Sequence, residues 1–212
     1  MKNIFLKPIL LLTLCLAVFS SCVKEDDFAI PTLKPVLFAQ DFEEIAVGSG
    51  SNEVAINLDG WVNANLGSGA PRVWSGKSFS NNKFAEFSSF YAPSGTSDDV
   101  WLITSSIDLS VATNKIFSFT SVNRFYNGSV LKVYISEDYD GTVAGITNAN
   151  WIELNPILPT SSAQDDDRIA SGPIDISSFN GTNVRIAFRY QGSKSSNPTT
   201  TFQLDDIKIY EN

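Results

Sequence analysis

The sequence contains no histidine, and this absence excludes several kinds of catalytic site. Serine and cysteine nucleophiles in the common triads need histidine as the general base, and many zinc sites use histidine ligands. We therefore exclude Ser-His-Asp catalysis, Cys-His catalysis and histidine-ligated zinc. The sequence also lacks a glycine-rich phosphate-binding loop placed before a helix.

Cysteine is nearly absent, because the 212 residues include only Cys15 and Cys22. Cys15 lies in an apolar run, residues 9–19, which follows two lysines and has the length of a secretory signal rather than a membrane span. We predict that residues 1–21 form a signal peptide. The mature monomer would then keep one thiol and could form no internal disulfide.

Small residues, Ser20 and Ser21, precede Cys22. This arrangement resembles the lipobox of bacterial lipoproteins, whose cysteine is acylated and becomes the mature N-terminus. The resemblance predicts lipidation of Cys22 and anchoring to the outer membrane, while an ordinary secretory signal is the alternative. Residues 24–27 resemble a signal for display on the cell surface. We expect residues 22–35 to be the lipidated N-terminus and a flexible tether.

Basic residues are scarce: the chain has 15 of them against 23 acidic residues, and its formal net charge is −8. Nucleic acids and anionic lipids bind through clustered Lys and Arg. We therefore expect no nucleic-acid partner, and membrane contact only through the lipid. The acidic run at residues 165–167 is predicted to be a solvated loop.

Helical periodicity is missing too, and short stretches of alternating apolar and polar residues take its place. Leu131, Val133 and Ile135 share one face of a strand, and residues 184–190 alternate in the same way. Asn-Gly and Asp-Gly turns separate such stretches. The predicted strands are residues 36–42, 60–65, 83–87, 100–104, 115–120, 129–136, 151–154, 184–190 and 202–210. Many short strands in one domain predict an all-β antiparallel β-sandwich, a jelly roll, over residues 36–212.

A series of motifs runs through this domain in a characteristic order. They are Phe38 to Glu43, Gly60-Trp61, Asp98 to Thr104, Ile107 to Leu109, Leu131 to Gly141, Trp151 to Leu154, Ile174 to Phe179, Val184 to Tyr190 and Leu204 to Ile207. The series resembles the choice-of-anchor J and cleaved-adhesin domains of bacterial surface proteins, which are distantly similar to MAM-type jelly rolls. The resemblance implies a galactose-binding-like jelly roll, a fold that hosts many functions.

Acidic residues near both ends of the domain suggest a cation site. Asp41 and Glu43 lie two apart on the first predicted strand, so we expect them on one face. Asp205 shares a face with Ile207 and Ile209, which would direct it toward the core, where a carboxylate needs a cation or several donors.

Two readings of Asp205 stay open. Arg185 and Arg189 are candidate salt-bridge partners for it. In the resembled family, the early acidic strand and the late Asp-Asp pair contribute to a structural calcium site. Carried onto this chain, the resemblance implicates Asp41 and Glu43 together with Asp205 or Asp206, with calcium tying the chain ends together.

Aromatic residues beside turns are candidates for ligand binding, because sugar rings stack on exposed aromatic faces. Trp74 lies in residues 69–78, which we predict to be a loop, and the other candidates precede turn sequences. The alternative for all of them is burial in the core. The predicted ligand-binding residues are Trp74, Phe90, Tyr91, Phe125 and Tyr126, whereas Trp61, Trp101 and Trp151 are predicted to be packing residues.

These patterns favour a cell-surface lipoprotein that acts as a non-catalytic binding or adhesion module, for glycan above all. A structural or accessory subunit of an outer-membrane protein complex is the alternative. A glycoside hydrolase needs only two suitably spaced carboxylates, and nothing in the sequence pairs two of its glutamates in that way. We therefore predict that the protein is not an enzyme.

Overall fold

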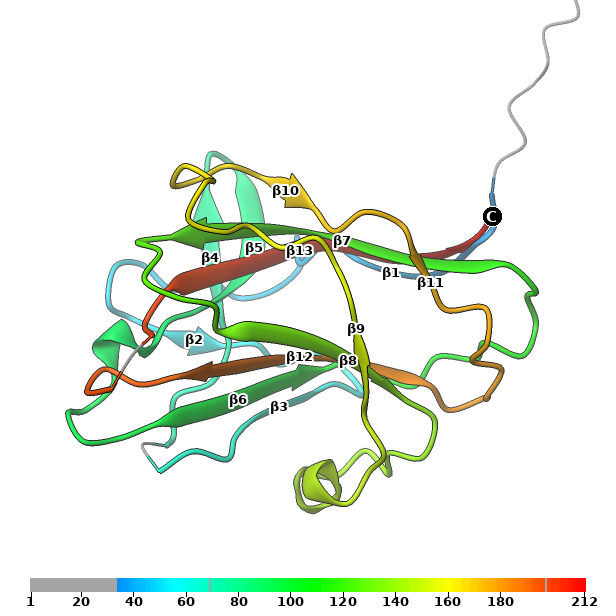
Figure 1. The fold of residues 1–212 in the computed structure, drawn as a ribbon, viewed down its shortest axis with the longest axis horizontal. Coiled ribbons are helices and arrows are strands. Elements are labelled where there is room, and N and C mark those ends of the chain that lie inside the picture. The colour runs from blue at the N-terminus through cyan, green and yellow to red at the C-terminus, as the bar shows by residue number, and fades with distance from the viewer. Residues whose placement is uncertain (1–33, 69, 197) are drawn as a thin grey trace, which may run out of the picture. The chain divides into compact units, whose positions relative to one another are not determined.

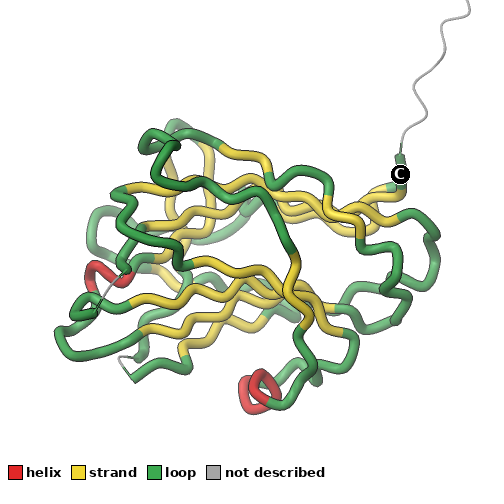
Figure 2. Tube along the Cα trace, viewed as in Figure 1, coloured by secondary structure: helices red, strands yellow, loops and turns green. Residues whose placement is uncertain are grey.

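The computed structural model describes residues 34–212 except residues 69 and 197, and residues 34–212 make one compact unit. The predicted signal peptide, Cys22 and all but two residues of the predicted tether lie outside the described residues. Strands, turns and loops make up nearly all of the chain (Figure 2). In the described part, no helix has the length and apolar character needed to cross a membrane.

The larger of two sheets has eight strands, all paired antiparallel (Figure 1). Its order is β10-β7-β13-β5-β4-β2, with β1 also paired to β13 and β11 to β7. The strands are β1 (Val36–Gln40), β2 (Val54–Ala55), β4 (Ser75–Phe79), β5 (Asn82–Phe87), β7 (Lys115–Arg124), β10 (Ile169–Ala170), β11 (Ile174–Asp175) and β13 (Thr201–Glu211).

The smaller sheet has five strands in the order β3-β6-β12-β8-β9, also antiparallel. Two short 3-10 helices, η1 (Ser89–Tyr91) and η2 (Val143–Thr147), lie in loops. The strands are β3 (Val62–Asn65), β6 (Asp98–Ile103), β8 (Leu131–Ser136), β9 (Ile152–Leu154) and β12 (Arg185–Gly192). The structure therefore confirms the predicted all-β sandwich of the jelly-roll type.

The core lies between the two sheets and is built from the alternation seen in the sequence. Leu131, Val133 and Ile135 of β8 are buried there, beside Ile186 and Phe188 of β12. Burying one such side chain contributes about 1.5–3 kcal/mol relative to leaving it exposed. The inward faces of the two sheets thus supply most of the driving force for folding.

The described part of the chain begins at one end of the sandwich, where Val36 pairs with Tyr210. At the other end of β13, Thr201 pairs with Arg124. Nine steps along a strand span about 30 Å, so these two ends of β13 are well separated. The loop after Arg124 therefore lies opposite the end of the sandwich at which the described residues begin (Figure 1).

The prediction that residues 69–78 form a loop is wrong, because strand β4 begins at Ser75. Its sequence, Ser-Gly-Lys-Ser-Phe, shows no apolar alternation, so the pattern gives no strand signal. Pairing with β5 holds it in place through the two-residue turn Ser80-Asn81. Both turn residues have positive φ, 50° and 66°, as a type I′ hairpin requires.

Candidate functional site

A groove of about 740 Å³ lies on the outer face of the larger sheet. Its floor includes Glu86 of β5 and Val122 of β7, which flank Gln203 of β13 in register. The neighbours of Gln203 along β13, Phe202 and Leu204, point into the core instead. The strand alternation that builds the core on one face therefore presents polar side chains to the groove on the other.

The floor is fixed by hydrogen bonds between neighbouring strands. Nε2 of Gln203 donates to Oε2 of Glu86 at 2.9 Å, and the hydroxyl of Ser75 donates to the Glu86 carbonyl at 3.2 Å. Gln203 is 9% exposed, so its amide is held by this contact. The floor thus has hydrogen-bonding groups in defined positions.

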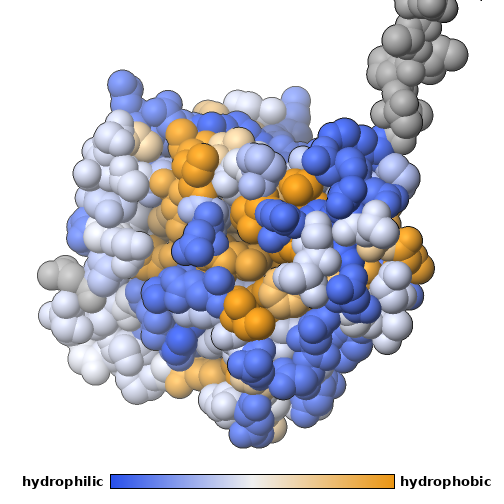
Figure 3. All heavy atoms as spheres, turned by 45° about the vertical axis from the view of Figure 1, so that its right-hand side comes forward, coloured by the Kyte–Doolittle hydropathy of each residue, from blue (hydrophilic) through white to orange (hydrophobic). Residues whose placement is uncertain are grey.

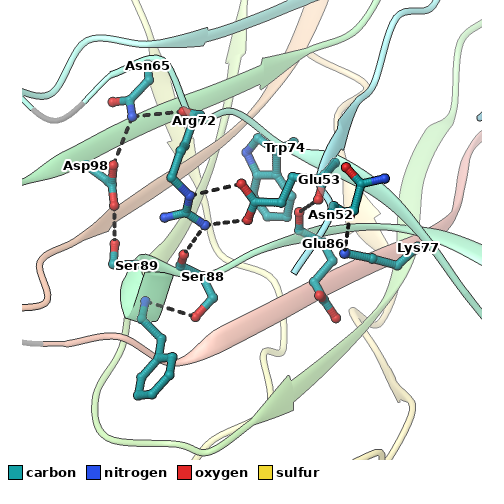
Figure 4. A network of polar contacts seen from close by, with 12 residues as sticks. Asn52, Glu53, Asn65, Arg72, Trp74, Lys77, Glu86, Ser88, Ser89 and Asp98 are labelled. Carbon is teal, nitrogen blue, oxygen red and sulfur yellow. Dashed lines mark hydrogen bonds and ion pairs between the residues drawn. The ribbon is translucent and has the colours of Figure 1, made fainter. Parts of the chain in front are cut away.

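One wall of the groove is the loop of residues 48–53. Nζ of Lys77 donates to the carbonyls of Gly50 and Asn52, each at 2.9 Å, and Figure 4 shows the contact with Asn52. Where the chain approaches β4, a Cβ on Gly76 would lie 2.1 Å from the Ala46 carbonyl oxygen. Only glycine permits this close approach, so the sequence of β4 helps to set the position of the wall.

Behind that wall, Arg72 ties three segments together (Figure 4). Its Nε donates to Oε2 of Glu53 at 2.9 Å, and NH2 donates to the Ser88 carbonyl at 2.8 Å. The guanidinium also lies 5.0 Å from the centre of the Phe87 ring, within the range of a cation–π contact. Glu53, which lines the groove, is therefore held by a paired charge.

The opposite wall includes Asp166 and Arg168, from the loop before β10. Nε of Arg124 lies 2.9 Å from Oδ1 of Asp166, and NH2 of Arg168 lies 3.0 Å from one carboxylate oxygen of both Asp205 and Asp206. Each guanidinium that lines the groove is thus matched by a nearby carboxylate. The charged side chains of the lining are three cations and three acids: Lys77, Arg124, Arg168, Glu53, Glu86 and Asp166.

Aromatic side chains complete the groove. Phe79, at the end of β4, is 72% exposed, and Tyr91 of η1 is 59% exposed. Phe84 also lines the groove but is 7% exposed. Rings next to fixed amide and carboxylate groups can stack on an apolar ligand face and hydrogen-bond to its polar groups.

Of the five predicted ligand-binding residues, only Tyr91 lines this groove. Phe90 and Phe125 are exposed, at 57% and 68%, and Tyr126 is half-buried, but they lie outside it. Phe79 was missed, although the Ser-Asn-Asn sequence that follows it is a turn signal of the same kind used for the other aromatics.

The prediction that Trp74 binds a ligand is wrong, because its side chain is completely buried. The ring packs 6.1 Å from Phe87 and 6.4 Å from Tyr190, measured between ring centres. Trp74 directly precedes β4, and its backbone N–H donates to Oδ1 of Asn63. The residue is a core anchor because the segment around it is paired rather than a free loop.

The predicted placement of Asp41 and Glu43 on one strand face is also wrong. Strand β1 ends at Gln40, and Phe42 has a φ of 57°, which breaks the extended conformation between the two acids. Oδ1 of Asp41 accepts from the backbone of Glu43, whose own Oε1 accepts from the backbone N–H of Lys83.

Asp205 is buried, as predicted, but on the opposite side of the sheet from Ile207 and Ile209. Asp206 has a φ of 51°, and the register with β7 shifts between Asp205 and Lys208. This β-bulge reverses the alternation, so Asp205 points outward.

The partners of Asp205 on that outer side are Arg168, at 3.0 Å, and the side-chain amide of Asn82, at 2.9 Å. Neither of the two arginines proposed as its partners reaches it. Arg189 pairs with Asp99, and Arg185 donates to backbone carbonyls. The buried carboxylate of Asp205 is therefore satisfied by donors that the sequence did not reveal.

Among the described residues, no group of three His, Cys, Asp or Glu side chains gathers closely enough to hold a metal ion. The structure thus does not bring Asp41, Glu43, Asp205 and Asp206 together as a ready-made ligand set. Calcium binding by these residues stays a prediction.

The outer face of the smaller sheet differs from the groove face, because the chain itself covers it. Trp101 packs against Tyr134 and Trp151, and Tyr139 packs against Trp151. Burial, reinforced by the nearby charge of Asp140, raises the pKa of Tyr139 to about 12. Trp101 and Trp151 are packing residues, as predicted.

Comparisons with known proteins agree with this fold. A family model described as "Domain of unknown function (DUF5017)" matches residues 74–209. The K1 cleaved adhesin domain of Lys-gingipain from Porphyromonas gingivalis W83 superposes with a TM-score of 0.53 and 17% identity, covering 82% of this chain and 98% of that one. The K3 domain of the same protein gives 0.51 and 16%, with 84% and 100% covered. No curated protein matches the sequence. At these identities the likeness establishes a cleaved-adhesin-like jelly roll.

Proposed function

The chain belongs to the DUF5017 family, and from that premise we propose that it is a non-catalytic binding or adhesion module that recognises glycan at the bacterial cell surface. The observation that carries the proposal is the groove on the outer face of the larger sheet. It combines exposed rings with hydrogen-bonding side chains that other residues hold in place. The fold it shares with adhesin domains of Lys-gingipain is consistent with such a role.

The chemistry of the groove suits sugars. A pyranose has an apolar face that stacks on an aromatic ring and hydroxyl groups that need hydrogen-bond partners. Phe79 and Tyr91 offer exposed rings, while Glu86 and Gln203 offer an acceptor and an amide between them. Pre-positioned polar groups reduce the ordering cost of binding.

The same groove is poorly equipped for glycoside hydrolysis. That reaction needs two carboxyl groups, one to protonate the leaving oxygen and one to act as base or nucleophile. Glu53 and Asp166 are each paired with an arginine, and Glu86 is held by Gln203. Glu53 and Asp166 are thus committed to ion pairs, and only Glu86 keeps a carboxylate oxygen without a partner among the described residues. Because the reaction needs two carboxyl groups, we propose binding without catalysis.

Anchoring through Cys22 would place the groove for display. The tether joins the domain beside β1, at the Tyr210 end of β13, whereas Tyr91 and the loop after Arg124 belong to the opposite end. A lipid on Cys22 would therefore attach the domain by the end that is remote from Tyr91. Replacing Cys22 by Ser should release the protein from the membrane fraction and leave the fold of residues 34–212 intact.

Glycan arrays followed by isothermal titration calorimetry test the binding function directly. The protein used is the chain from residue 23 onward, which contains the whole described core. We expect saturable binding to at least one class of polysaccharide. Absence of binding to any glycan by a folded sample would contradict the proposal.

Docking onto an outer-membrane protein is a second candidate. Phe90 and Phe125 are exposed outside the groove. Separately, on the face in Figure 3, apolar residues form an interrupted band among hydrophilic ones. Pull-down from native envelopes separates the two functions. A stoichiometric protein partner without any glycan binding would favour docking.

A further inference from the structure

We infer that the groove accepts a neutral glycan chain of several sugar residues, laid along β5 and stacked on Phe79 at one end and Tyr91 at the other. The inference rests on the proposed glycan-binding function and adds the length and the charge of the ligand to it. Several features of the groove lead to it.

The first feature is the separation of the two exposed rings. Phe79 pairs with Asn82, where β5 begins, and Tyr91 lies in the 3-10 helix that follows the end of β5 at Phe87. Five steps of strand between Asn82 and Phe87 span about 17 Å. One sugar ring, which is close in size to one aromatic side chain, cannot stack on both, so a ligand that uses both must be a chain.

The second feature is that both rings are available and that one of them, Tyr91, is held by a neighbouring ring. Phe79 and Tyr91 each keep more than half of their surface in solvent. The Tyr91 ring packs edge-on against Phe90, with 5.2 Å between ring centres and an interplanar angle of 88°. Held by that contact, the Tyr91 ring offers a sugar a fixed surface at low entropic cost.

Between the two rings, the floor carries groups that suit sugar hydroxyls. Oε2 of Glu86 accepts from Gln203, whereas Oε1 of Glu86 has no hydrogen-bond partner among the described residues. A carboxylate oxygen facing a groove is a strong acceptor for hydroxyl donors. A bound chain would therefore find a polar contact between its two stacking positions, nearer to the Tyr91 end.

The third feature is the balance of charge. The chain carries a formal net charge of −8, yet the groove lining has equal numbers of cations and acids. Arg124 and Arg168 are each within 3.0 Å of a carboxylate, and Lys77 is bonded to backbone carbonyls. An acidic sugar would meet no unmatched guanidinium here and would be repelled by the overall field, which favours a neutral ligand.

The test is calorimetric titration of the chain from residue 23 onward with linear neutral oligosaccharides. Cello-, xylo-, manno- and laminari-oligosaccharides, each from disaccharide to hexasaccharide, are the probes, and oligogalacturonides of equal length are the acidic counterpart. We expect affinity in at least one neutral series to rise with length and then level off. The oligogalacturonides should bind at least tenfold more weakly.

Phe79→Ala and Tyr91→Ala should each lower the affinity for the longest active probe about tenfold, and should reduce its dependence on length. Phe125→Ala is the matched control, because Phe125 is equally exposed but lies outside the groove. It should leave the affinity unchanged. Thermal melts confirm that all three variants fold.

The outcomes separate the inference from the function it rests on. If the glycan array and the probes show no binding at all, the glycan-binding function itself fails. Glycan binding that is independent of length, that prefers the oligogalacturonides, or that is lost in Phe125→Ala but kept in Phe79→Ala overturns the inference alone.

Discussion

The outer faces of the two sheets differ in how far the chain itself covers them. On the smaller sheet, the segment of residues 137–151 folds back over Trp101 and Tyr134, and Ile146 of η2 is buried with them. On the larger sheet, the loops at the two edges stop short of the middle and leave a groove over β4, β5, β7 and β13. One face is sealed by the chain itself, and the other is open to a ligand.

On the sealed face, the N–H and O–H groups of three aromatic side chains are hydrogen-bonded within the protein. Nε1 of Trp101 donates to Asp99, Nε1 of Trp151 donates to the Ile146 carbonyl, and the Tyr139 hydroxyl donates to the Thr142 carbonyl. Aromatic residues therefore serve stability on one face, where these three side chains are hydrogen-bonded as well as packed. On the other face, Phe79 and Tyr91 are left in solvent.

The largest expected effect comes from opening the sealed face. Trp101→Ala removes a ring that is 5% exposed and contacts Tyr134, Trp151 and Arg189. We expect a loss of about 3–5 kcal/mol in the free energy of unfolding, because a large cavity replaces the ring. Urea denaturation measures it. A loss below about 1 kcal/mol would show that this face is not closed by packing.

Calcium offers the next largest effect and bears on the groove face, where Asp205 lies. If Asp41, Glu43, Asp205 and Asp206 hold calcium, an ion at a hundredfold excess over its dissociation constant adds about 2.7 kcal/mol. The melting temperature would then rise with calcium and fall with EDTA. An unchanged melting temperature in both solutions would contradict the prediction.

Alkaline pH should weaken the sealed face. The pKa of Tyr139 is raised by burial from 10.0 to about 12, so the folded state holds this proton more tightly than the unfolded state. The contribution of protonated Tyr139 to the free energy of unfolding is complete below pH 10. It is lost as the pH rises toward 12, at a cost on the order of 2 kcal/mol. Tyr139→Phe should reduce the slope of unfolding free energy against pH in this range. An unaltered slope would contradict this assignment.

The smallest effect on stability is expected on the open face. Phe79→Ala should change the free energy of unfolding by no more than about 0.5 kcal/mol, because the ring is 72% exposed. Urea denaturation beside Trp101→Ala gives the contrast between the two faces. A loss comparable to that of Trp101→Ala would mean that Phe79 serves packing instead of ligand binding.

The sandwich could be predicted from sequence because its central strands are half-buried and alternate visibly. Leu131, Val133 and Ile135 face the core as expected, and so does the inward face of β12. Strand β4 gave no such signal, because its residues are mostly small and polar and its position depends on pairing with β5. Missing β4 led directly to the wrong assignment of Trp74.

The site was harder to predict, because it depends on backbone irregularities and on contacts between distant segments. A bulge at Asp206 turns Asp205 outward. The apolar residues shift from positions 202 and 204 to positions 207 and 209 across it, so the sequence indicates a reversal but not which acid it turns outward. The pairing of Asp205 with Arg168 joins residues 37 positions apart. Tyr91 could be predicted from its place beside a turn, and Phe79 carries the same signal, but the polar residues that line the groove could not be predicted.

Nuclear magnetic resonance mapping tests the central claim most directly, namely that the open face of the larger sheet binds glycan. The chain from residue 23 onward would be labelled with nitrogen-15 and titrated with the best ligand from the glycan array. We expect the perturbed amides to cluster in β4, β5, the neighbouring part of β13 and the loop of residues 48–53. Perturbations confined to the smaller sheet and residues 137–151 would contradict the account.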